Sequence, residues 1–219
     1  MTHSHSKMTS QSFRKPMPVL GKTRKDVLSE FRRSELLTAA RTIFSKKGFH
    51  DATIDDVAEA AQVAKGTVYL YYKSKRELYL EALRYGIESL NRELEVKALE
   101  PGSCRDKLRI LAATKMEFFE ENREFFNIYY SELGKLPSHP ASLDLVKDLY
   151  FAQAKIFSSL LQEGVRRREI RKIDVEKTAF AVADLTRDVT TQRFLGFSKT
   201  SMKNDIDFVV DFIWKGISR

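Results

Sequence analysis

The residues of this chain that are best suited to chemistry lie between Thr53 and Leu78, in the segment TIDDVAEAAQVAKGTVYLYYKSKREL. Thr53 and Asp56 form a Thr-x-x-acid pair that predicts the start of a helix. A second short helix is predicted from Lys65, with cationic and hydrogen-bonding residues on its outward side. Two short helices joined by a tight connection form a helix-turn-helix, whose second helix enters the major groove of DNA. The segment therefore predicts contact with DNA rather than catalysis.

A third helix is predicted directly after this motif. Ser74 and Glu77 form another capping pair, which places Lys75 in the first turn of the helix. Free backbone N–H groups and the helix dipole both favour an anion at such a position. A contact with a DNA phosphate is therefore expected at the start of this helix.

These residues, with the helix that precedes them, resemble the tetracycline-repressor-like (TetR) family of bacterial transcriptional regulators. The resemblance covers roughly residues 34–83. Its ordered features are a long first helix ending at Gly48-Phe49, the Thr53 cap, the stretch Lys65-Gly66-Thr67-x-Tyr69, and an aromatic-Lys-Ser-Lys-x-x-Leu exit. Several features in one order are far more specific than an isolated helix-turn-helix pattern.

The sequence departs from the family pattern at two positions of the motif. The turn glycine that is common in the family is Gln62 here, and the usual hydroxyl cap of the recognition helix is Ala64. Gln62 is expected to take the turn conformation at some steric cost, because it carries a side chain. Ala64 cannot cap a backbone N–H group.

The position of each residue in the motif predicts its DNA contact. The N-terminal residues of a recognition helix meet base edges, so the first candidates are Lys65, Gly66, Thr67 and Tyr69. The resemblance implies phosphate contacts from Thr53, Tyr71 and Lys75. Packing in the core is the alternative for Tyr69, and it is the expectation for Tyr72.

The charge of the chain is concentrated near this motif. Residues 1–80 hold 15 Lys and Arg against 8 Asp and Glu, a net charge of +7, whereas residues 81–219 hold 23 against 22, a net charge of +1. Neutralisation of phosphates supplies most non-specific DNA affinity, so a basic domain beside a nearly neutral one is expected if only the first meets DNA. Basic surfaces are also common for solubility, and charge alone does not decide the function.

Helical periodicity continues to the end of the chain, and strand-like alternation is scarce. We therefore predict an all-α protein of about nine helices, with three helices and the start of a fourth in the DNA-binding domain. Caps at Ser103 and Asp174 predict two of the later helices. The expected divisions are a flexible basic arm over 1–21, a helix-turn-helix DNA-binding domain over 22–83, and a helical effector-binding and dimerisation domain over 84–219.

The first half of the second domain is rich in aromatic residues. In the TetR family this domain binds a small effector between its helices, so the resemblance implies an apolar or aromatic ligand pocket. A plain aromatic core is the alternative for each residue. The residues assigned to the pocket are Met116, Phe119, Phe126, Tyr129, Tyr130, Phe157 and Phe180, with Glu117, Asn127, Glu132 and Arg187 as polar candidates.

Two copies of the chain are expected to act together. One helix-turn-helix contacts only a few base pairs, so specific binding needs a dimer and a palindromic operator. The resemblance implies a dimer built from the last two helices as a four-helix bundle, although the same stripe of small residues is compatible with an ordinary core. The interface candidates are Ala179, Val182, Ala183, Thr186, Phe212 and Trp214.

No set of residues predicts an enzyme. The four histidines, His3, His5, His50 and His139, lack metal-ligand spacing, and the sequence has no glycine-rich phosphate-binding motif. We expect no metal and no cofactor, and the expected partners are an operator in double-stranded DNA, an unidentified small effector and a second copy of the chain. An architectural DNA-binding protein without an effector is the main alternative, and a helical module that binds an acidic protein is another.

The cellular location follows from simple counts. The single cysteine, Cys104, excludes an intramolecular disulfide framework and suits a reducing compartment. No apolar run approaches the ~18 residues of a membrane-spanning helix, and the polar start of the chain lacks a signal-peptide core. The sequence therefore predicts a cytoplasmic, nucleoid-associated protein without membrane contact, and the resemblance implies that it represses transcription.

Overall fold

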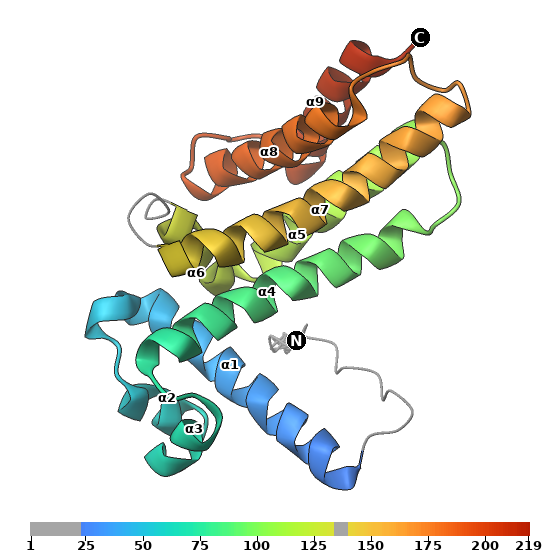
Figure 1. Cartoon of the computed structure of the whole chain (residues 1–219). Helices are drawn as coiled ribbons and strands as arrows, with labels where there is room; N and C mark the ends of the chain where they lie inside the picture. Colours follow the sequence, from blue (N-terminus) through green and yellow to red (C-terminus); the bar gives the residue numbers. More distant parts are fainter. Residues whose placement is uncertain (1–22, 134–139) are drawn as a thin grey trace, which may run out of the picture.

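The computed structural model describes residues 23–133 and 140–219, and these residues form the predicted all-α fold (Figure 1). The predicted basic arm over 1–21 lies outside the described residues. Within them, the chain forms one isolated β-bridge, between Ile170 and Ser218. The helices are α1 (Arg24–Asp51), α2 (Ile54–Ala60), α3 (Lys65–Tyr71), α4 (Lys75–Ala98), α5 (Cys104–Glu121), α6 (Arg123–Leu133), α7 (Pro140–Arg166), α8 (Val175–Phe194) and α9 (Met202–Ile217).

Side-chain caps set the start of most of these helices. The predicted caps at Thr53, Ser74, Ser103 and Asp174 are all confirmed, since each side chain accepts a hydrogen bond from the backbone N–H three residues later. Ser103 and Thr53 form complete capping boxes, in which the acidic residue also binds the cap backbone. The helix boundaries therefore follow from local sequence to within a residue or two.

The tight turns use left-handed backbone conformations, which glycine adopts without strain and other residues adopt at a cost. Gly48, with φ of 74°, interrupts α1 where the sequence predicted its end. Gln62, with φ of 56°, takes the turn conformation between α2 and α3, as predicted. Arg168, with φ of 60°, does the same after α7. Two turns are therefore built from side chains that the conformation does not favour.

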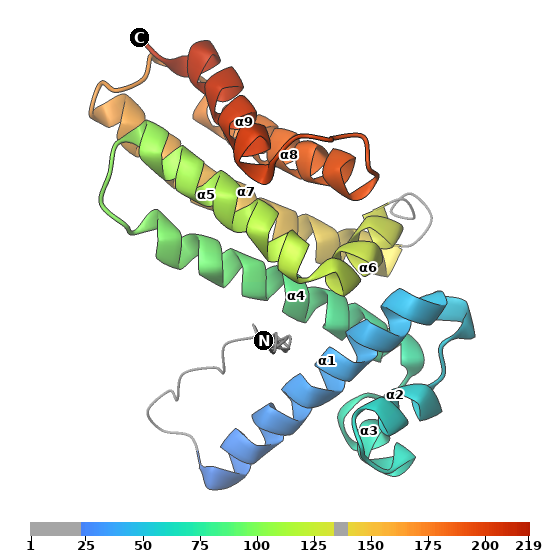
Figure 2. The same ribbon diagram turned by 180° about the vertical axis from the view of Figure 1, so that it is seen from behind.

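The helices form a small head and a larger layered domain (Figures 1 and 2). Helices α1, α2 and α3 pack with the start of α4, and α4 then continues out of the head alongside α5 and α7. Helices α8 and α9 form the outermost layer, packed on α7 and α5. Because α4 belongs to both parts, a shift of this helix moves the head relative to the rest.

A continuous hydrophobic core runs through both parts, from Leu36 in α1 through Leu83 in α4 to Val210 in α9. The ring of Phe125 in α6 packs directly against Gly86 in α4, where an added Cβ atom would lie 2.3 Å from it. A larger residue would therefore push α6 away from α4. No helix among the described residues is both long and apolar enough to cross a membrane.

Candidate DNA-binding face and effector domain

Helix α3 presents one side to solvent and one side to the core of the head. Val68 is fully buried, whereas Tyr69 and Leu70 are 48% and 83% exposed. Lys65 and Gly66 are also exposed, and Thr67 is partly exposed. The structure thus brings the four predicted base-contacting residues together on the outer part of one short helix. The exposure of Tyr69 argues against the packing alternative.

The backbone of the turn fixes the position of α3. The N–H of Val63 donates to the carbonyl of Ala58 at 2.9 Å, and the N–H of Thr67 donates to the carbonyl of Ala64 at 2.8 Å. Ala64 contributes no side-chain cap, as predicted. The first N–H groups of α3 therefore remain suited to contact an anion such as a phosphate.

Gly66 has no packing role within the head. An added Cβ atom at this position would meet no heavy atom within 4 Å. The space beside its backbone is therefore open on the outer side of α3. A glycine here lets the backbone come close to a flat partner, which is what contact with a groove of DNA requires.

Lys65 is held by an ion pair on the surface. Its ammonium lies 2.7 Å from the Oδ2 atom of Asp55 at the start of α2, and both side chains are more than half exposed. This neighbouring carboxylate raises the pKa of Lys65. Exposed pairs contribute little stability, so the ammonium can exchange Asp55 for a phosphate or a base edge at small cost.

The three predicted phosphate contacts have different surroundings. The hydroxyl of Thr53 accepts a hydrogen bond from the N–H of Asp56 at 3.1 Å, and its own hydrogen can still be donated. The ammonium of Lys75 donates to the carbonyls of His50 and Ala52 at 3.0 and 2.9 Å. It also lies 4.8 Å from the ring centroid of Phe49. Lys75 therefore ties α4 to the end of α1, a role that sequence analysis missed.

Tyr71, the third predicted phosphate contact, is partly buried at the end of α3. It borders an open groove of about 390 Å³ between α3 and the first turns of α1. The groove is both apolar and cationic, and its other lining residues are Lys25, Leu28, Ser29, Phe31 and Arg32. Tyr72 is buried, which confirms the prediction that it belongs to the core.

The second domain keeps most of its predicted effector residues inside. Phe119 stacks on Phe125 with ring centroids 5.7 Å apart, and Phe126 and Tyr129 lie 5.5 and 5.7 Å from Phe119. Tyr130 stacks on Phe126 and is partly exposed. Met116 and Phe157 are buried in the same domain. We call Phe119, Phe125, Phe126 and Tyr129 the aromatic cluster.

Phe180 belongs to a different group of rings. Its neighbours are Tyr150 at 5.2 Å and Phe151 at 5.4 Å, both from α7. The hydroxyl of Tyr150 donates to the Oδ1 atom of Asp184 at 2.6 Å, and the guanidinium of Arg187 lies 2.9 Å from the same oxygen. Burial and the Asp184 carboxylate raise the pKa of Tyr150.

A buried lysine lies between these groups, and sequence analysis did not identify it. Lys115 in α5 is 2% exposed, and its ammonium donates to Oε1 of Gln153 in α7 at 2.8 Å and to the carbonyl of Ala183 in α8 at 2.9 Å. The amide of Gln153 reaches Oδ1 of Asn91 in α4 at 3.4 Å. Burial lowers the pKa of Lys115 to about 7. The signal in the sequence was its helical spacing from Leu111 and Phe119, which predicts an inward position.

The other polar candidates do not converge on the aromatic cluster. Glu117 is exposed. Asn127 faces the head, where its amide donates to the hydroxyl of Ser45 in α1 at 3.2 Å. Glu124, also in α6, accepts from the hydroxyl of Thr42 in α1 at 2.8 Å. The side chain of Glu132 lies outside the described residues. Among the polar candidates whose side chains the structure describes, Arg187 is the one that lies close to the buried polar groups.

The dimer prediction needs correction for α8. Its four candidates in α8 are at most 3% exposed, because they face the core of their own chain, and such side chains have no surface left for a partner. They are Ala179, Val182, Ala183 and Thr186. On α9, Phe212 is 63% exposed, Phe208 is 56% exposed, and Trp214 is partly buried. The periodicity located the buried stripe correctly, but it could not say which neighbour covers that stripe.

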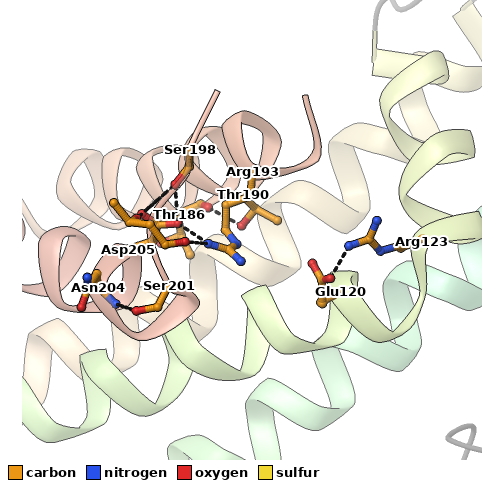
Figure 3. Close-up of polar contacts among 10 residues, drawn as sticks. Glu120, Arg123, Thr186, Thr190, Arg193, Ser198, Ser201, Asn204 and Asp205 are labelled. Carbon is orange, nitrogen blue, oxygen red and sulfur yellow. Dashed lines mark hydrogen bonds and ion pairs between the residues drawn. The ribbon is translucent and has the colours of Figure 1, made fainter. Parts of the chain in front are cut away.

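The loop between α8 and α9 is fastened by one carboxylate (Figure 3). Asp205 accepts hydrogen bonds from Arg193 at 2.6 Å, Ser198 at 2.9 Å and Thr200 at 2.5 Å. These bonds lower the pKa of Asp205 despite its burial. Salt bridges from Arg105 and Arg109 in α5 to Asp211 and Asp207 fix the rotation of α9. The Phe208 and Phe212 rings are therefore held on the outer side of α9.

Two family sequence models match this chain. The model described as "Bacterial regulatory proteins, tetR family" matches residues 36–82, which cover the head. The model described as "Tetracyclin repressor-like, C-terminal domain" matches residues 101–191, from before α5 into α8. The two matches follow the same division that the structure makes between the head and the layered domain.

Individual relatives and a solved structure agree with these matches. The chain is 30% identical over 156 residues to the HTH-type transcriptional repressor KstR2 of Mycolicibacterium smegmatis. This match covers 71% of this chain and 76% of the relative. The chain is 29% identical over 189 residues to the HTH-type transcriptional activator FasR of the same species, with 85% and 83% covered. The crystal structure of FadR from Bacillus subtilis in complex with stearoyl-CoA superposes on this chain with a TM-score of 0.73. The match covers 82% of this chain and 96% of that chain at 18% sequence identity, so it shows a shared fold alone.

Proposed function

This chain belongs to the TetR family of bacterial transcriptional regulators, and we propose that it is a repressor that leaves its palindromic operator when a small apolar effector binds its second domain. It is a DNA-binding regulator rather than an enzyme, and it binds its operator as a dimer. The observation that carries the proposal is the outer face of α3, where Lys65, Gly66 and Tyr69 are exposed and take no part in packing the core of the head.

The α3 face supports direct contact with base edges. Lys65 offers a cation suited to the acceptors of guanine, and Tyr69 offers a hydroxyl and a ring. Gly66 permits close approach of the backbone. Thr67, one residue on, offers a hydroxyl and a methyl group for a thymine. We assign phosphate contacts to Thr53, Tyr71 and Lys75, which flank α3 and orient the head on the duplex.

The outer layer supports a dimer through α8 and α9. Phe208 and Phe212 lie one turn apart on α9, and two large exposed aromatic rings on a helix face are typical of an interface. We propose that they pack against the exposed side of α8, which carries Ala181 and Gln192. Two heads presented in this way would meet successive major grooves about 34 Å apart.

The second domain supports an apolar effector. Its interior is dominated by the aromatic cluster, and a related fold, FadR from Bacillus subtilis, was solved with stearoyl-CoA. We propose that a molecule with a long apolar or aromatic part binds among these rings. We further propose a DNA-binding domain over 22–83 and an effector and dimer domain over 84–219, with α4 crossing between them. Operator binding would place the protein on the nucleoid.

The proposal is tested by a genome-fragment binding selection with purified full-length protein at near-physiological salt. A regulator of this kind is expected to enrich a few fragments that share one short palindrome, because two heads must bind together. A Tyr69→Ala variant, run in parallel, should lose this enrichment. Many weak sites without a shared palindrome would instead support an architectural DNA-binding protein, and absence of DNA binding even at low salt would support a protein-interaction module.

A further inference from the structure

Lys115 is a buried cation, and among the described side chains it has no anionic partner in direct contact. Both atoms that accept its hydrogen bonds, Oε1 of Gln153 and the carbonyl oxygen of Ala183, are neutral. Among the described residues, no carboxylate oxygen lies within 4 Å of its ammonium. A buried charge is costly unless it is paired, and an ammonium has three hydrogens of which these bonds use two. The side chain is therefore equipped to bind one more acceptor, preferably an anion.

The surroundings of Lys115 are polar on one side and aromatic on the other. Phe119 of the aromatic cluster follows Lys115 by one turn of α5, and Tyr129 packs on Phe119 at 5.7 Å. On the other side, Arg187 adds a second cation, which is paired with Asp184 at 2.9 Å. A ligand bound here would meet a cationic group at one end and aromatic rings along the rest.

We propose that Lys115 binds the carboxylate of the effector, which is an apolar acid such as a fatty or arylalkanoic acid with its chain among the aromatic cluster. This inference rests on the proposed function, since it assigns the chemical class of the effector. The carboxylate takes the third hydrogen of the Lys115 ammonium or replaces Gln153 as an acceptor. The apolar chain displaces packed rings, because Lys115 and Phe119 are both buried in this structure.

The hydrogen bonds of Lys115 connect the site to the head. Gln153 contacts Lys115 in α5 and Asn91 in α4, and all three side chains are buried. A carboxylate that replaces Gln153 releases one end of this chain of hydrogen bonds. Since α4 begins in the head, a changed contact at Asn91 alters the orientation of α4 and hence the spacing of two heads in a dimer.

The titration of Lys115 supports this assignment. Burial and the nearby Arg187 of α8 together lower its pKa to about 7, although Asp184 and Asp188 in the same helix oppose that shift. Tyr129 in α6 and Tyr150 in α7 are also near Arg187 and Asp184, and their own pKa values are raised. A bound carboxylate favours the charged ammonium. Binding above pH 7 must therefore take up a proton, and affinity falls by up to about tenfold per pH unit.

The test uses full-length protein without DNA, with binding measured by calorimetry at pH 6.5. The ligands are laurate, dodecanol and lauroyl-CoA, each below its micelle or solubility limit. Laurate is expected to bind, and dodecanol, which has the same chain without charge, is expected to bind at least tenfold more weakly. Lys115→Met is expected to weaken laurate binding about 10- to 100-fold, because a hydrogen bond to a charged group is lost. Lys107→Met, which removes an α5 lysine eight residues away, should leave laurate binding unchanged.

A second variant and a second readout separate this role from a structural one. Lys115→Gln keeps a hydrogen-bonding side chain without charge, and it should lose laurate affinity to a similar degree while melting normally. The laurate affinity of the native chain should decrease from pH 6.5 to 8.5, and that of Lys115→Gln should not. Equal laurate affinity in the native chain and both Lys115 variants overturns the inference.

Comparing laurate, dodecanol and lauroyl-CoA shows whether the inference about the carboxylate fails alone or together with the proposed function. Binding of lauroyl-CoA or dodecanol but not laurate overturns the carboxylate assignment and leaves an apolar effector in place. Binding of none of the three overturns both the assignment and the proposed class of effector. The operator selection described above is independent of all these outcomes, because it measures DNA binding by the full-length protein without a ligand.

Discussion

Tyr69 in α3 and Tyr129 in α6 show how differently the two parts of this molecule present their functional residues. Tyr69 is half exposed on a short helix that has no packing use for it, whereas Tyr129 packs on Phe119 and Phe125 at 5.7 and 5.9 Å. DNA is large and rigid, so the surface that binds it can be complete before contact. A small apolar effector is enclosed by its site, and because the aromatic cluster is closely packed here, we propose that this site opens when the effector binds. The head is therefore preformed, and the second domain is the part that changes.

The largest effect expected from this comparison is on stability in the second domain. Phe119→Ala removes a ring that is buried among four others, so we expect a loss of about 3–5 kcal/mol in the free energy of unfolding. Tyr69→Ala should change it by less than about 0.5 kcal/mol. Urea denaturation followed by circular dichroism compares the two variants. An equal loss of unfolding free energy in both variants would contradict the claim that Phe119 supports the core whereas Tyr69 does not.

The exposed rings of Phe208 and Phe212 on α9 contrast with the buried aromatic cluster of the same domain. Phe212→Glu should weaken the dimer by about 2–4 kcal/mol, because a charge would be buried in an interface on both copies. Sedimentation velocity across a concentration series measures the shift. Lys203→Glu, another charge change on an exposed residue of α9, is the control. A native chain that is monomeric at micromolar concentration would contradict the dimer through α9.

The buried Lys115 should make the second domain less stable than it would be with an apolar side chain. Lys115→Met is expected to raise the free energy of unfolding by about 1–4 kcal/mol at pH 7 or below. The pKa of Lys115 is about 7 in the folded state and near 10.5 in the unfolded state. Between these pH values the unfolded state binds more protons than the folded state. The free energy of unfolding of the unmutated protein therefore rises with pH in this range. The advantage of Lys115→Met should therefore shrink from pH 7 to 10, as measured by urea denaturation. A constant difference would contradict the low pKa.

The α3 face should affect binding and not folding. Lys65→Ala and Tyr69→Ala are each expected to cost about 1–3 kcal/mol in operator binding, with an unchanged circular dichroism spectrum. Fluorescence polarisation with a labelled operator measures the loss. Gln62→Ala is the control, because it changes a side chain in the turn before α3 and not one of the predicted DNA contacts. Normal operator affinity in both α3 variants would remove α3 as the recognition helix.

The smallest expected effect concerns a helix cap that the sequence predicted. Ser74 accepts a hydrogen bond from the N–H of Glu77 at 3.1 Å, so Ser74→Ala should cost about 1 kcal/mol in the free energy of unfolding. Ser74→Thr keeps the hydroxyl and should restore most of the loss. Thermal melts of the three proteins test this. A loss that Ser74→Thr does not restore would mean that the hydroxyl is not what stabilises the start of α4.

The sequence predicted the local features well because they depend on near neighbours. Caps such as Thr53 with Asp56 act over three residues, and the prediction that Tyr72 belongs to the core is confirmed by its burial. It failed where a residue depends on distant neighbours. The sequence correctly predicted that Ala179 and Val182 lie on one buried side of α8, but these residues pack on the core of their own chain. Lys115 was overlooked because a lysine is rarely buried, although its helical spacing from Leu111 and Phe119 points inward; its polar partners on α7 and α8 could not be predicted from the sequence.

The most direct test of the account is a footprint of the full-length protein on its best genomic fragment. Two heads with preformed α3 faces should protect two major-groove patches about 10 base pairs apart, related by the symmetry of a palindrome. Tyr69→Ala should weaken both patches together, because each comes from one copy of the same helix. A single patch without symmetry, or continuous protection without sequence preference, would contradict the central claim that a dimer binds its operator through the exposed face of α3.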